Sequence, residues 1–110
     1  SNGVFTLSGL IEIEPAPKQI SLDNAYPNPF NPTTTISFGL AEDTEVSIQV
    51  YNIQGSLVET LASQYMEAGY HSVVWNADQH SSGIYFVKML TSPSTGGHGT
   101  VNIQKLMLIK

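Results

Sequence analysis

The sequence predicts an all-β fold, an antiparallel β-sandwich of about seven short strands. Short stretches in which apolar and polar residues alternate recur at spacings of about ten residues, with turn residues between them. No stretch has a convincing helical period. With 41% hydrophobic and 12% charged residues, the 110-residue chain has the composition of a folded protein with one modest core. We therefore expect one sandwich domain with almost no helix.

Residues 1–18 are expected to form an upstream strand and linker, and residues 19–110 the domain itself. Val4 to Glu14 is rich in apolar residues, whose alternation near its end fits a strand. The prolines of Glu14 to Lys18 favour an extended linker. Because the chain begins without methionine, we interpret it as a fragment from the C-terminal end of a larger precursor.

The domain opens with the segment Tyr26-Pro27-Asn28-Pro29-Phe30-Asn31-Pro32, in which each proline fixes φ and lacks a backbone donor. Thr33 to Leu40 then alternates and predicts a half-buried strand. Ala41 to Thr44 is a polar turn, and Glu45 to Tyr51 predicts a second strand by the same alternation, with Val46, Ile48 and Val50 facing inward. We expect these two strands to be antiparallel neighbours.

The middle of the chain predicts a hairpin and two further strands. Gly55 stands where a tight turn needs positive φ, and Leu57 to Leu61 resumes an extended pattern that pairs back on the preceding strand. Gln64 to Gly69 is expected to be a connection, and Tyr70 to Trp75 the next strand.

The last third of the chain predicts two strands joined by a loop. Ile84 to Leu90 follows a Ser81-Ser82-Gly83 turn and is apolar on both faces, which is typical of a central strand. Thr91 to Gly99 holds three glycines and a proline, so we expect a mobile loop. Thr100 to Lys110 supplies the final strand.

The charge distribution excludes one class of partner and leaves two interpretations of the tail. The chain has nine acidic residues, four lysines and no arginine, which gives a net charge of −5. No nucleic acid partner is therefore expected. Residues after Asp78 carry three of the lysines and no acid. These lysines either solubilise strand ends and edges, or Lys105 and Lys110 belong to a recognised tail.

No pattern of catalytic or metal-binding residues emerges. The histidines, His71, His80 and His98, lack zinc-site spacing, and the absence of cysteine excludes disulfides and thiolate ligands. The acids of Glu42 to Glu45 lack the spacing of a calcium loop, although calcium in a turn stays open. No serine lies in a Gly-x-Ser-x-Gly elbow. We expect no enzyme, no cofactor and no metal.

Trp75 has two interpretations. It lies in phase with Val73, so it would bury a large apolar area in the core. Alternatively, Trp75 and the tyrosines could stack on sugar rings. The core interpretation is favoured because of this phase. It implies that Trp75→Ala should unfold or badly loosen the domain, since truncating a core tryptophan costs about 3 to 5 kcal/mol.

Five motifs in order carry a family resemblance from Leu22 to Lys110. They are Tyr26-Pro27-Asn28-Pro29-Phe30-Asn31-Pro32, Tyr51-Asn52-Ile53-x-Gly55-x-x-Val58, Gly69 followed by Trp75, Ser82-Gly83-Ile84-Tyr85-Phe86, and Lys105-Leu106-Met107-Leu108-Ile109-Lys110. Together they resemble the type A C-terminal sorting domain of the type IX secretion system of Gram-negative bacteria. They are also similar to the Ig-like domain of flagellar hook-capping proteins.

The resemblance implies an Ig-like, non-catalytic domain that directs an upstream cargo in the same polypeptide through the periplasm and across the outer membrane. The protein would be secreted or held at the cell surface. The implied partners are the outer-membrane secretion machinery and a surface sortase-like peptidase, which removes the domain or exchanges it for an anchoring glycolipid. Cleavage is expected around Glu14 to Ser21.

The resemblance also assigns roles to residues. The sorting signal would comprise Lys105, Leu106, Met107, Leu108, Ile109 and Lys110. The fold-determining positions would be Pro27, Asn28, Pro29, Phe30, Gly55, Gly69, Trp75 and Gly83. An exposed terminal strand could add to a partner's sheet through main-chain bonds, or pair with its own copy as a weak homodimer. The alternative function is a structural or carbohydrate-binding Ig-like accessory module of a secreted hydrolase.

Overall fold

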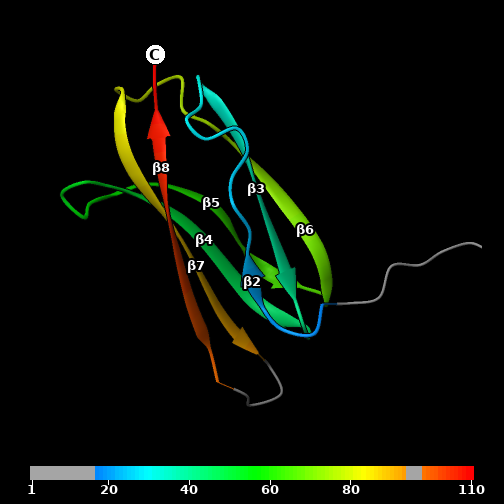
Figure 1. Ribbon diagram of the computed structural model, residues 1–110. Helices are drawn as coiled ribbons and strands as arrows, with labels where there is room; N and C mark the ends of the chain where they lie inside the picture. The colour runs from blue at the N-terminus through cyan, green and yellow to red at the C-terminus, as the bar shows by residue number, and fades with distance from the viewer. Residues whose placement is uncertain (1–16, 94–97) are drawn as a thin grey trace, which may run out of the picture.

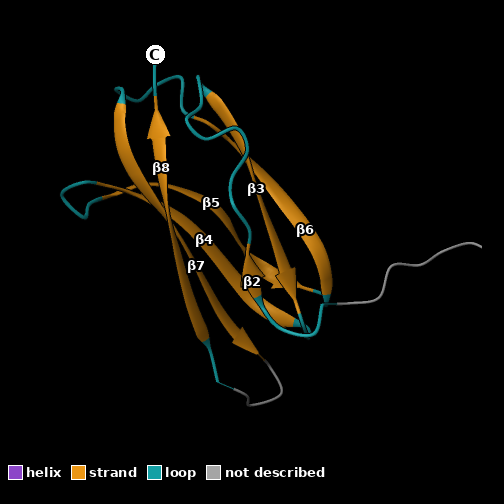
Figure 2. Cartoon of the chain, viewed as in Figure 1, coloured by secondary structure: helices purple, strands orange, loops and turns teal. Residues whose placement is uncertain are grey.

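The computed structural model describes residues 17–93 and 98–110, which form seven strands and no helix (Figures 1 and 2). The expected strand at Val4 to Glu14 lies outside the described residues. The strands are β2 (Ser21–Leu22), β3 (Thr33–Leu40), β4 (Thr44–Asn52), β5 (Leu57–Met66), β6 (Gly69–Asn76), β7 (Gly83–Pro93) and β8 (Thr100–Leu108).

These strands form two antiparallel sheets. The three-stranded sheet has the order β2-β3-β6, and the four-stranded sheet has the order β5-β4-β7-β8. In Figure 1 the two sheets lie against each other as layers. The predicted all-β sandwich is confirmed, and β7 is a central strand as expected.

One predicted pairing is wrong. β3 and β4 are not neighbours, because β3 pairs with β2 and β6 whereas β4 pairs with β5 and β7. The turn after Leu40 crosses from one sheet to the other, and the turn between β5 and β6 crosses back beside it. Asp43 Oδ1 accepts a hydrogen bond of 2.9 Å from the Ala68 backbone N–H and joins the two crossings. Both strands bury one face in the same core, so alternation could not distinguish partners across a sheet from partners across the core.

Two element boundaries also differ from expectation. β5 continues to Met66, where a connection from Gln64 was predicted. Register shifts between Ile48 and Gln49 and between Val50 and Tyr51 disturb its pairing with β4. Bulges of this kind break the period-two pattern on which the sequence interpretation depended.

The predicted Thr91 to Gly99 loop is shorter than expected at its start. β7 extends to Pro93, and Thr91 Oγ1 lies 2.6 Å from Thr100 Oγ1. The Ser92 backbone N–H donates to Thr44 Oγ1 over 3.0 Å. Hydroxyl residues that indicated a loop in the sequence thus make hydrogen bonds within the sheet. Residues 94–97 lie outside the described part of the chain.

The hairpin between β4 and β5 is confirmed. Gly55 has φ of 85°, a backbone conformation that favours glycine. Its N–H donates to the Asn52 carbonyl at 3.0 Å, and the Asn52 side chain accepts from the N–H groups of Gln54 and Ser56. The turn residues therefore satisfy their own polar groups outside the sheet.

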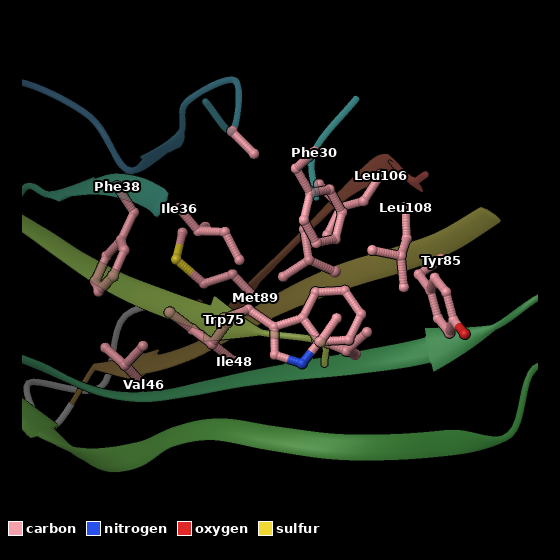
Figure 3. Packing of buried hydrophobic residues seen from close by; sticks show 14 of the residues in the cluster. Phe30, Ile36, Phe38, Val46, Ile48, Trp75, Tyr85, Met89, Leu106 and Leu108 are labelled. Atoms are coloured by element: carbon pink, nitrogen blue, oxygen red, sulfur yellow. The ribbon is translucent and has the colours of Figure 1, made fainter. Parts of the chain in front are cut away.

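The core lies between the sheets and holds the large side chains that alternate inward (Figure 3). Trp75 is 0% exposed, and its ring centroid lies 5.5 Å from that of Phe30 and 5.3 Å from that of Tyr85. The inward positions predicted for Val46, Ile48 and Val50 are confirmed by exposures of 2% or less. The final strand contributes to the same core.

Candidate functional site

The C-terminal strand β8 presents two different faces. Leu106 and Leu108 are 0% and 1% exposed and point into the core. Met107 and Ile109, which alternate with them, are 37% and 51% exposed, and Lys105 is also exposed. The six residues assigned to the sorting signal are thus divided between the core and the surface.

The inward leucines belong to an aromatic part of the core. Figure 3 shows Leu106 and Leu108 close to Phe30, with Trp75 and Tyr85 nearby. Leu108 also forms an isolated parallel bridge with Phe30. Removing these leucines would uncover the aromatic residues, so their first role is structural.

In the C-terminal half of β8, the proline-rich segment lies along the outer edge of the strand. Asn28 acts like a strand residue: its side-chain Nδ2 donates to the Lys105 carbonyl, and its Oδ1 accepts from the Met107 N–H, both at 3.0 Å. The Phe30 N–H donates to the Met107 carbonyl at 3.0 Å, and the Ile109 N–H donates to the Phe30 carbonyl at 2.9 Å. We call Asn28 to Phe30 the edge segment.

Gln104 extends this contact toward β2. Its Oε1 accepts from the Ala25 N–H at 2.6 Å, and its Nε2 donates to the Asp23 carbonyl at 2.8 Å. The segment from Asp23 to Phe30 is therefore bonded to β8 at several points along its length.

The last residue is bonded to the connection between β6 and β7. The Lys110 N–H donates to Ser82 Oγ at 3.0 Å, and its Nζ donates to the carbonyls of Asp78 and His80 at 2.7 and 3.0 Å. Sequence reasoning could not find these carbonyl acceptors, because a backbone acceptor has no residue-type signature. The Lys110 charge is thus held in one place beside the end of β8.

This geometry differs from the freely exposed terminal strand expected from the sequence. From the Lys105 carbonyl to the Ile109 N–H, the backbone groups on the outer edge are already bonded to the edge segment. In an antiparallel strand, alternate residues direct both backbone groups to the same side. Val101 and Ile103 therefore direct theirs to the outer edge, where no described residue bonds them. Strand addition is available only in this N-terminal half.

The structure brings two distant sequence motifs together. Pro27, Asn28, Pro29 and Phe30 lie along the final strand, and the peptide bonds before Pro27 and Pro29 are cis. Gly83 pairs with Leu108 at the start of β7. Gly55 lies in the turn between β4 and β5, and Gly69 is the first residue of β6, where it pairs with Leu40.

Trp75 is not placed to stack on a sugar. Besides being fully buried, its Nε1–H donates to Glu59 Oε1 at 2.8 Å, and the same oxygen lies 3.4 Å from His80 Nε2. The polar edge of the indole is therefore satisfied by the partly exposed carboxylate of Glu59, and buried tryptophans usually have such a partner.

Among residues 17–93 and 98–110, no three histidine, aspartate or glutamate side chains group as metal ligands. In the same part of the chain, no helix has the length and apolar character needed to cross a bilayer.

A family model described as the secretion system C-terminal sorting domain matches residues 24–106. The chain belongs to this family. It is a sorting domain of the type IX system, so a protein that carries it is exported across the outer membrane and is secreted or held at the cell surface. This role implies contact with the secretion machinery and a cargo in the same polypeptide. Sorting domains are in general non-catalytic.

Two solved structures share the fold at low identity. Dimeric latent PorU from Porphyromonas gingivalis matches with a TM-score of 0.61 and 18% identity over 96% of this chain, which spans 10% of PorU. CopC from Methylosinus trichosporium OB3b matches with a TM-score of 0.52 and 21% identity, over 82% of this chain and 93% of CopC. No curated protein matches the chain.

Proposed function

We propose that the secretion machinery recognises the outward side of the end of the sorting domain, formed by Lys105, Met107, Ile109 and Lys110. The inward residues Leu106 and Leu108 keep that side in place. The observation that supports this proposal is the strict alternation of buried and exposed residues along a strand whose outer edge is already bonded.

Recognition in this half of β8 uses side chains. The edge segment occupies the backbone groups that strand addition would need, so a partner meets two apolar side chains between two lysines. The Lys110 side chain keeps a defined position because its Nζ donates hydrogen bonds to two carbonyls. Two cations, of which Lys110 is held in place, favour a partner site that carries carboxylates.

In this proposal the domain has no catalytic role. A surface sortase-like peptidase would cut upstream of the fold. Ile20 packs against the core and Ser21 pairs with Gly39, whereas Pro17 and Lys18 lie before β2. We place the cut and the domain boundary between Glu14 and Gln19, because cleavage after Ile20 would remove a packed residue.

The test is a reporter with a signal peptide, fused in front of the 110-residue chain and expressed in a host that has the type IX machinery. The outward variant replaces Lys105 and Lys110 with Ala and Met107 and Ile109 with Ser, and it leaves both inward leucines intact. The expected result is a reporter that accumulates in the periplasm while the thermal unfolding of the purified domain stays within a few degrees of the parent.

A matched control carries Tyr70→Ser and Val74→Ser, which alter exposed apolar residues on β6. This control should deliver the reporter normally. Normal delivery by the outward variant would contradict the proposal. Deleting residues 105–110 is a poorer test, because it also removes two core leucines and unfolds the domain.

A further inference from the structure

The outer face of the four-stranded sheet carries more apolar surface than a solvent-facing sheet needs. We call it the outer apolar face and define it by Tyr51, Ile53, Phe86, Leu90, Val101 and Ile103. The strand register places Tyr51 beside Phe86, and Leu90 beside Val101. Ile53, Val101 and Ile103 are 69%, 59% and 62% exposed. Such a contiguous patch is typical of an interaction site.

A shallow depression lies on this face. It has a volume of about 440 Å³ and is lined by Tyr51, Asn52, Ile53, Gly55, Phe86, Lys88 and Ile103. The side chain of Lys88 crosses it, with Nζ 4.9 Å from the centre of the Tyr51 ring. A cation on an aromatic wall is partly held by the ring and still available to an anion.

The opposite outer face has a different character. On the three-stranded sheet, the outward positions include the hydroxyl residues Thr35, Ser37 and Ser72 together with Tyr70 and Val74, which are 55% and 60% exposed. The Ser37–Ser72 pair lies between these two apolar side chains along the strands. The outward apolar side chains are therefore interrupted on this face, whereas on the four-stranded sheet they adjoin one another.

The charged side chains beside the outer apolar face are lysines. Lys88 and Lys105 lie in neighbouring rows of β7 and β8. Among the described residues, no carboxylate lies within ion-pair distance of either lysine, and the contact of Lys88 is with the Tyr51 ring. The chain as a whole carries a net charge of −5, which makes this cationic apolar face distinct.

We infer that the outer apolar face docks a protein of the secretion machinery that presents an apolar segment flanked by carboxylates. This inference rests on the proposed sorting function and extends the contact from the end of β8 across β7 to β4. A second copy of this chain is a poorer occupant, because a symmetric contact would place the lysines of both copies on the same interface. Lys88 and Lys105, which lie beside apolar side chains on this face, complement a partner segment whose carboxylates lie beside its own apolar side chains.

The experiment uses the reporter fusion with a photo-crosslinking amino acid, p-benzoylphenylalanine, at Ile103 or, as a control, at Val74. The two positions have similar exposures of 62% and 60% and lie on opposite faces of the sandwich. During export, the probe at Ile103 should crosslink to a machinery protein, through a segment that holds both apolar and acidic residues. Lys88→Glu should lower the crosslinked fraction about tenfold, because a like charge then faces the partner's carboxylates.

A second pair of variants avoids dependence on Lys88. Ile103→Ser should reduce crosslinking from a probe at Tyr51 and slow reporter delivery, whereas Val74→Ser should change neither. Equal crosslinking from positions 74 and 103, or crosslinking at 103 only to another copy of the domain, would overturn the inference.

The two proposals fail in different ways. In one outcome, the outward variant at residues 105–110 stops delivery, whereas the Lys88 and Ile103 variants crosslink and deliver normally. The proposed docking at the outer apolar face is then wrong, and the proposed recognition of the terminal residues stands. If the outward variant delivers normally, the proposed function itself fails.

Discussion

The two halves of β8 differ in what surrounds them. From Lys105 onward, the strand pairs with β7 on one edge and with the edge segment on the other, and two of its leucines are buried. From Val101 to Ile103 it pairs with β7 alone, and its outward side chains are about 60% exposed. The C-terminal half is therefore built as part of the core, and the N-terminal half as an open edge.

The difference shows that a terminal strand can be essential to a fold and still present a recognisable surface. In the C-terminal half, where the edge segment covers the outer edge, a partner meets side chains in a fixed arrangement. In the open half, a partner also meets the outer-edge backbone groups of Val101 and Ile103, which no described residue bonds. The following predictions test this contrast, from the largest expected effect to the smallest.

Truncating an inward leucine should give the largest loss of stability. Leu106→Ala is expected to lower the free energy of unfolding by about 2 to 5 kcal/mol, because it leaves a cavity beside the aromatic core. Ile103→Ala in the open half should change it by less than about 0.5 kcal/mol. Urea denaturation followed by Trp75 fluorescence measures both, and similar losses for the two variants would break the contrast.

Removing the edge segment's amide donor should have a smaller effect. Asn28→Asp keeps the acceptor for the Met107 N–H and replaces the donor to the Lys105 carbonyl with a carboxylate oxygen. The expected loss is about 1 to 3 kcal/mol, with faster amide hydrogen exchange at Met107 and Ile109. Asn24→Asp makes the same charge change next to β8 and should alter exchange at Met107 little. Unchanged protection in the Asn28 variant would mean that the edge is not held by this side chain.

Releasing the last side chain should change stability only slightly. Lys110→Met removes the donors to the Asp78 and His80 carbonyls, both at an exposed position. We expect the free energy of unfolding to fall by less than about 1 kcal/mol, and NMR relaxation to show greater motion of Ile109 and residue 110. Lys18→Met, before the first strand, is the control for the loss of one charge. A large loss of stability would show that the terminus contributes to the core more than its exposure indicates.

The open half should support only weak self-pairing. We propose that two copies pair as antiparallel strands through the outer edge from Val101 to Lys105, forming a homodimer with a dissociation constant of about 1 mM or weaker, because few backbone groups are free there. Val101→Lys should abolish this dimer in sedimentation at high concentration and change the unfolding free energy by less than about 0.5 kcal/mol. A dimer that persists in this variant would place the contact elsewhere.

The sequence predicted individual strands better than their neighbours. Alternation placed the inner residues of β4 correctly, and the double apolar face of β7 indicated its central place, because both patterns depend on local burial. The neighbours of β3 were wrong, because partners across a sheet and partners across the core leave the same alternation. The end of β5 was missed because bulges interrupt the period.

The candidate site was accessible to sequence reasoning only in part. The resemblance pointed to both the Asn28 motif and the Lys105 to Lys110 run, and alternation in the run separates inward from outward residues. That the two motifs lie side by side was not visible, because about eighty positions separate the bonded atoms of Asn28 and Met107. The acceptors of Lys110 are carbonyls, which the sequence does not mark.

The bonding of Asp23 to Phe30 with β8 has a consequence for how the molecule forms. A ribosome makes the edge segment and β6 before β8, so until β8 is complete Phe30 and Trp75 have no Leu106 or Leu108 to cover them. Closure by contacts of such long range is slow and depends on the whole span being present. A copy truncated before β8 would keep an uncovered aromatic core and would be a substrate for proteases, so the fold itself discriminates finished domains from unfinished ones.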